Sequence, residues 1–179
     1  MDKKESKRQL VAMLESGRSK TEIFKTLSGG EVKDRVLAYW IGAYADPALC
    51  QRHSGKIKTL LFLTIVQALL GAVFGFFLGS MIGPGAAVFF TLFAAGVPLL
   101  FAWGFYRNVA QAYTIYVILS LSQFPRMFQG FEEDPLLTLI GAAITLGMVF
   151  FVAYLKTLLF PDLGFLGSKK VKGHYVFSS

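Results

Sequence analysis

The sequence predicts an all-α, multi-pass membrane protein: a four-helix transmembrane bundle preceded by a small N-terminal cytoplasmic helical domain. Of its 179 residues, 54% are hydrophobic and only 16% are charged, whereas a soluble domain carries about 25% charge. The hydrophobic residues gather in runs of about 20, the length that crosses the hydrocarbon core of a bilayer. Charged residues concentrate before the first run. These observations exclude an ordinary soluble enzyme.

Residues 1–56 predict three short amphipathic helices and a linker. The first segment, 5–16, ends at Gly17, a residue type that commonly follows a helix. The second begins at Ser19, and Glu22 stands three residues later in the spacing of a capping box. The third covers 31–44 and carries an apolar stripe with helical periodicity.

We expect the third segment to present a docking face for a cytoplasmic partner. Val36, Trp40 and Tyr44 recur every four residues and fall on one side of a helix. Residues 17–27 are also similar to the start of a helix-turn-helix in recombinase-type DNA-binding proteins. The wide apolar face of 31–44 is unlike a base-reading helix, so we expect protein or membrane-surface docking and no nucleic-acid partner.

Residues 57–160 hold four candidate spans, at about 59–82, 86–105, 109–124 and 136–160. The third has only 16 residues and several polar side chains, which makes its hydropathy the weakest of the four. An even number of spans nevertheless accounts best for the Lys and Arg residues, because it places nearly all of them on one side of the membrane.

The distribution of Lys and Arg predicts the orientation. Twelve of the 18 precede the first run, and four more begin at Lys156. If both termini are cytoplasmic, 17 of the 18 lie on the cytoplasmic side, as the positive-inside rule requires. We therefore expect a plasma (bacterial inner) membrane protein with both termini in the cytoplasm and residues 161–179 as a basic cytoplasmic tail.

Four glycines repeat every four positions along the first span, and Gln67 precedes them at the same spacing. Such a face lets a second helix approach closely. We expect a packing face within the chain or an oligomer contact, with small residues of the fourth span as its partner. The residues concerned are Gln67, Gly71, Gly75, Gly79 and Gly83, with Gly141 and Thr145 on the fourth span.

Polar residues at the start of the third span and along it form a second group. Polar groups in lipid are costly and are commonly functional, so these side chains predict a pore lining or a headgroup contact. The alternative is that Arg107 reaches the interface and the amides bond neighbouring helix ends. The group comprises Arg107, Asn108, Gln111, Thr114 and Ser120.

Metal, cofactor and catalytic chemistry find no support in the sequence. Cys50, His53 and His174 are the only soft-metal ligands, and a zinc site needs about four. No phosphate loop or nucleotide fingerprint occurs. We expect no metal, no cofactor and no enzymatic activity.

Two functions remain open. The leading expectation is a non-catalytic assembly, scaffold or regulatory subunit of a membrane complex, with membrane lipids and either its own copies or other membrane proteins as partners. The alternative is an oligomeric ion channel or small-solute transporter lined by the third span, including Ser120 and Gln123.

Overall fold

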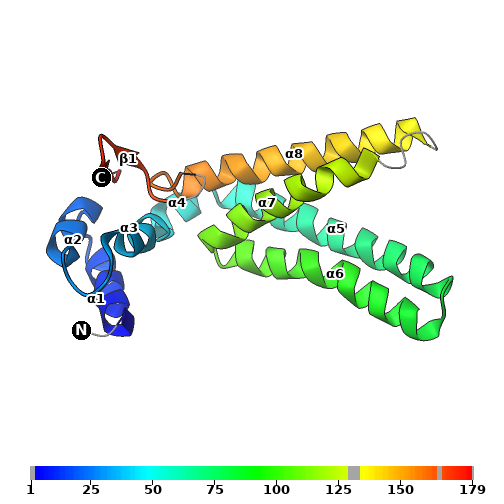
Figure 1. Ribbon diagram of the computed structural model, residues 1–179, viewed down its shortest axis with the longest axis horizontal. Helices are drawn as coiled ribbons and strands as arrows, with labels where there is room; N and C mark the ends of the chain where they lie inside the picture. The colour runs from blue at the N-terminus through cyan, green and yellow to red at the C-terminus, as the bar shows by residue number, and fades with distance from the viewer. Residues whose placement is uncertain (1–2, 129–133, 165–166, 179) are drawn as a thin grey trace. The chain divides into compact units, whose positions relative to one another are not determined.

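The computed structural model describes residues 3–128, 134–164 and 167–178, and these are mostly helical (Figure 1). The chain divides into two compact units. The terminal domain comprises Met1–Asp46 and Lys156–Ser179, and the apolar domain comprises Pro47–Leu155.

The terminal domain contains helices at the three positions that the N-terminal sequence predicted: α1 (Lys3–Glu15), α2 (Lys20–Leu27) and α3 (Asp34–Gly42). After α1 the chain turns at Gly17, whose φ of +79° is a left-handed conformation that glycine adopts without strain. The Ser19 side chain then accepts a hydrogen bond from the Glu22 backbone N–H and caps α2. Local capping chemistry therefore sets where the second helix begins.

The C-terminal segment folds onto these three helices rather than forming a separate tail. Strands β1 (Lys170–Val171) and β2 (His174–Tyr175) pair in an antiparallel hairpin. Phe177 then joins the buried core of the domain, which otherwise comes from the N-terminal half: Leu10, Ile23, Val32, Leu37, Ala38 and Ile41. The described part of 161–179, which the sequence predicts to be a basic cytoplasmic tail, thus places Phe177 in this core and the half-buried Tyr175 against it; its cytoplasmic location stays a prediction.

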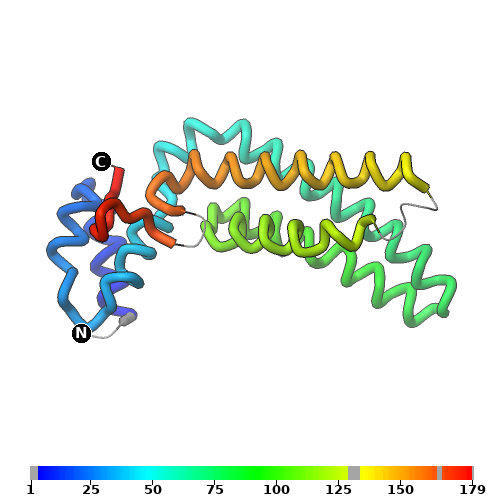
Figure 2. The backbone as a smooth tube through the Cα atoms, turned by 45° about the horizontal axis from the view of Figure 1, so that its top comes forward, coloured from blue at the N-terminus to red at the C-terminus, as the bar shows by residue number. Residues whose placement is uncertain are grey.

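The apolar domain contains α4 (Pro47–Arg52), α5 (Ser54–Ser80), α6 (Pro84–Tyr106), α7 (Ala110–Met127) and most of α8 (Pro135–Leu159). A turn at Gly83 joins α5 to α6, and the two helices run back along each other as a close hairpin (Figure 2). The Gly83 φ of +154° and the Pro84 that follows explain why the first helix stops and the second starts here.

Three of these helices, α5, α6 and α8, are long and apolar enough to cross a membrane, judged over the described residues by length and composition. The third predicted span also forms a helix, α7, of 18 residues. It is not among the three, because its polar side chains reduce its hydropathy.

Candidate functional site

A cavity of about 390 Å³ lies among four helices of the apolar domain. Helix α5 contributes Gln67, α6 contributes Val97, Pro98 and Phe101, α7 contributes Tyr116, Leu119, Ser120, Gln123, Arg126 and Met127, and α8 contributes Thr145. Its volume is within the range of small-molecule sites. Six of its eleven lining residues carry a polar group, although the surrounding helices are largely hydrophobic.

A hydrogen bond connects the polar wall of this cavity across two helices. The Tyr116 hydroxyl donates to Oε1 of Gln67 at 3.3 Å, and Ser120, one turn further along α7, lines the same cavity. The Tyr116 ring packs edge-on against Phe101, with centroids 5.2 Å apart. The ring is therefore held by α6 while its hydroxyl faces the polar groups of α5 and α7.

Among the residues predicted to line a pore, the structure places Ser120 on the cavity and the other four elsewhere. The Arg107 guanidinium lies over the Trp103 ring, 5.8 Å from its centroid. Asn108 adopts a left-handed φ of +49°, and its Oδ1 accepts from the Tyr113 hydroxyl at 3.5 Å. Thr114 bonds to the Ala110 carbonyl of its own helix. Gln111 is exposed and does not line the cavity.

The glycines of α5 lie against the backbone of α6. A Cβ added at Gly71 would lie 2.7 Å from the Ala94 carbonyl oxygen, and one at Gly75 would lie 2.5 Å from that of Phe90. Gly79 meets the start of α6 in the same way, whereas Gly83 has no such neighbour. At Gly71, Gly75 and Gly79 the backbones of α5 and α6 therefore approach closely.

The helix that fills this face differs from the expected one. The fourth hydrophobic run was expected to pack there, but the neighbours of the three glycines all belong to α6. On α8, Gly141 instead faces the Met127 side chain of α7, and Thr145 lines the cavity. The chain connection explains this, because only three residues, 81–83, separate α5 from α6 and hold the two helices side by side.

The predicted docking side chains contribute partly to the fold itself, although Tyr44 lies beyond the end of α3 at Gly42 and so outside the helical stripe that the sequence predicts. Val36 and Trp40 are half-buried and pack against the core of the terminal domain, and Tyr44 is also half-buried. Burial raises the pKa of Tyr44, and the charges of Glu15 and Asp46 raise it further. Their role in binding a partner remains a prediction.

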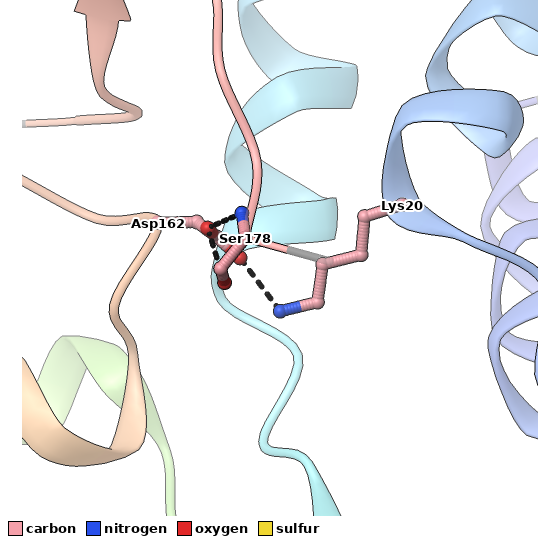
Figure 3. A network of polar contacts seen from close by, with 3 residues as sticks. All are labelled: Lys20, Asp162 and Ser178. Atoms are coloured by element: carbon pink, nitrogen blue, oxygen red, sulfur yellow. Dashed lines mark hydrogen bonds and ion pairs between the residues drawn. The ribbon is translucent and has the colours of Figure 1, made fainter.

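A polar network that sequence reasoning missed closes the terminal domain (Figure 3). The Lys20 ammonium donates to Oδ2 of Asp162 at 2.6 Å, and Oδ1 of the same carboxylate accepts from the Ser178 backbone N–H and hydroxyl. Asp162 is only 2% exposed. The network joins α2, the segment after α8 and the C-terminal strand region.

The charge state of Asp162 follows from these partners. Burial by itself would raise its pKa, but the hydrogen bonds from Lys20 and Ser178 and the positive charge of Lys20 outweigh it and lower the pKa below its usual value. The carboxylate is therefore ionised at neutral pH and acts as a structural anchor. The sequence signal that could have indicated it is a lone acid, Asp162, directly after the last hydrophobic run.

Among the described residues, no three His, Cys, Asp or Glu side chains come together as metal ligands. No protein-family model matches this chain, and no curated protein or solved structure is detectably similar to it. The cavity and the polar network must therefore be interpreted from their chemistry.

Proposed function

We propose that this chain is a four-span protein of the plasma (bacterial inner) membrane that provides a site or path for a small polar solute within its bundle, with both termini in the cytoplasm. The proposal has two parts, topology and activity, and each has its own support.

The shared core of the terminal domain supports an even number of crossings. Phe177 packs with residues of α1, α2 and α3, and the Asp162 carboxylate accepts hydrogen bonds from both Lys20 and Ser178. Segments that share a core lie on one side of a bilayer, so the chain between them crosses an even number of times. Helices α5, α6 and α8 supply three crossings, and α7 is then the fourth.

The positive charges support a cytoplasmic position for this domain. With both termini inside, Arg126 is the one Lys or Arg of the 18 on the outer side. Single cysteines in a Cys50→Ser background test the topology, at Ser80, Asn108, Glu132 and Lys172. A membrane-impermeant thiol reagent added outside should label positions 80 and 132 only. Labelling of 108 from outside, or of 172 together with 80, would refute the arrangement.

The observation that carries the activity is the polar cavity. Hydrogen-bonding groups at the middle of membrane helices are costly unless they face water, a solute or one another. Gln67, Tyr116, Ser120 and Thr145 come from three different helices and converge on one space. A small, hydrogen-bonding solute in this space could pair with the donors and acceptors that the Tyr116–Gln67 hydrogen bond leaves unused.

Two serines on α7 provide a matched test. Ser120 lines the cavity, whereas Ser122 is exposed on the helix and bonds to the Leu119 carbonyl. In a Cys50→Ser background, a small water-soluble thiol reagent should modify Ser120→Cys much faster than Ser122→Cys, because a thiol reacts as its thiolate in water. Equal rates, or no reaction at position 120, would contradict a hydrated cavity.

Flux measurements then test the activity. Liposomes containing the protein should be more permeable than empty liposomes to small neutral solutes such as glycerol or urea, or to K⁺ or Cl⁻. Ser120→Leu should remove the added permeability, and Ser122→Leu should keep it. Permeability equal to that of empty liposomes for all four probes would count against a path and leave the binding site to be tested with the thiol reagent.

A second candidate is the non-catalytic subunit of a membrane complex that the sequence favoured. It is supported by Gly96 of α6 and Gly147 of α8, where an added Cβ would meet nothing within 4 Å. These positions leave room for a helix of another chain. The native mass after mild extraction separates the candidates: a stoichiometric complex with other proteins favours the subunit, and a homo-oligomer favours the channel or transporter.

A further inference from the structure

A second cavity, of about 640 Å³, lies within the terminal domain and plays no part in the proposed solute path. Its walls include Arg35 and Tyr39 of α3, Ser168 of the segment before β1, and Lys170 and Tyr175 of the hairpin. The cavity exists because the C-terminal segment folds back beside α3.

The charge of this cavity is entirely positive. Arg35 and Lys170 line it from two separate elements, and no Asp or Glu is among its lining residues. Within the described part of the chain, neither cation takes part in an ion pair. The Lys170 ammonium lies 4.5 Å from the centroid of the Tyr175 ring, a contact that leaves its N–H groups able to donate. The cavity therefore favours an anion.

A buried hydroxyl adds a second, independent indication. The Oγ atom of Ser168 is inaccessible to solvent and has no hydrogen-bond partner among the described residues. A buried polar group without a partner is rare and costs free energy. An acceptor atom of a ligand in the adjacent cavity would satisfy this hydroxyl.

We propose that this cavity binds a phosphate group carried by an organic molecule, either a soluble phosphate ester or the headgroup of an anionic phospholipid. The Arg35 guanidinium presents a planar fork of donors that matches phosphate oxygens, and Lys170 and Ser168 supply further donors. A phosphate ester offers more acceptor oxygens than a carboxylate and, as a monoester, a larger charge. The Tyr39 and Tyr175 rings form a wall for its organic part.

Thermal unfolding of the full chain in neutral detergent tests the site, because a ligand that binds only the folded state raises the Tm. The probes are inorganic phosphate, glycerol 3-phosphate, short-chain phosphatidylglycerol, short-chain phosphatidylcholine and succinate, all at one ionic strength. We expect a saturable rise in Tm with glycerol 3-phosphate or with phosphatidylglycerol. A response to the soluble ester assigns a soluble ligand, and a response to phosphatidylglycerol alone assigns a lipid headgroup.

Matched variants locate the binding. The double variant Arg35→Gln/Lys170→Gln should weaken binding of the responding probe at least 10-fold. The control Lys7→Gln/Lys25→Gln makes the same change in net charge at exposed positions of α1 and α2, and it should bind as the wild type does.

Ser168→Ala separates a binding role from a structural one. Removing an unsatisfied buried hydroxyl should leave the Tm of the unliganded protein equal or higher, while affinity for the probe falls. The proposal is overturned if no phosphate-bearing probe raises the Tm, if succinate or phosphatidylcholine acts equally well, or if both double variants lose binding alike.

Discussion

The close contact between α5 and α6 makes Gly75→Ala a sharp test of the packing of the apolar domain. A Cβ at position 75 would lie 2.5 Å from the Phe90 carbonyl oxygen and 2.8 Å from its carbonyl carbon. Both are backbone atoms of α6, so no side-chain rotation can relieve the contact. The helices themselves must move apart.

The magnitude follows from this geometry. Ordinary van der Waals contact begins at 3.4 Å, so α6 must withdraw by about 1 Å near Phe90. A gap of that size forfeits roughly a quarter to a half of each dispersion contact it opens, and overpacking costs about 1–3 kcal/mol. Alanine also favours a helix over glycine by up to about 1 kcal/mol, which partly hides the loss.

Gly96→Ala supplies the control because it carries the same change in helix propensity without the clash. Gly96 lies inside α6, and an added Cβ there meets nothing within 4 Å. The free energy of unfolding of Gly75→Ala should therefore fall about 1–3 kcal/mol below that of Gly96→Ala. Loss of helical circular dichroism on heating, in one detergent, measures both variants against the wild type.

Two results would refute this reasoning. If Gly75→Ala unfolds at the same temperature as Gly96→Ala, or higher, then α5 and α6 do not approach as closely as described. If Gly75→Ala changes the native mass without changing stability, then this face joins subunits rather than helices of one chain.

Three further predictions concern the terminal domain. Because the folded pKa of Asp162 is lowered, its ionised form contributes stability that is complete above the unfolded pKa, near pH 4, and is lost as pH falls towards the folded pKa. The difference in the free energy of unfolding between wild type and Asp162→Asn should therefore shrink below about pH 4, and a difference that stays constant with pH would exclude this role. Lys20→Met leaves a buried carboxylate without its cation and should cost about 3 kcal/mol, whereas Lys25→Met at an exposed position should cost under about 0.5 kcal/mol in the same denaturation assay. Phe177→Ala should cost about 3 kcal/mol or more, and the more exposed Val176→Ala far less; equal losses would show that the C-terminal segment is not part of the core.

The helices were predictable because their signals are local. Ser19 and Glu22 cap α2 through a hydrogen bond within one turn, and Gly17 ends the preceding turn with a conformation that suits glycine. The hydrophobic runs likewise needed only composition and length to predict α5, α6 and α8. None of these features depends on a distant part of the chain.

The candidate site was predictable only in part. Ser120 and Gln123 stood out as polar residues in a hydrophobic setting, and both line the bundle cavity. Gln67 and Thr145 were assigned to helix packing, and their place on the same cavity depends on which helices meet. The positions of Arg126 and Tyr116 on this cavity were not predicted, because nothing in their spacing relates them to residues of α5 or α8.

Periodicity, capping residues and hydrophobic length specify which segments of this chain are helices and which could cross a membrane, since each acts over a few neighbouring residues. The partner of the glycine face, the return of the C-terminal segment to the N-terminal core, and the pairing of Lys20 with Asp162 across 142 positions were decided by folding. Such contacts depend on the competition among all surfaces for burial and for charge partners. That competition is resolved only when the whole chain packs.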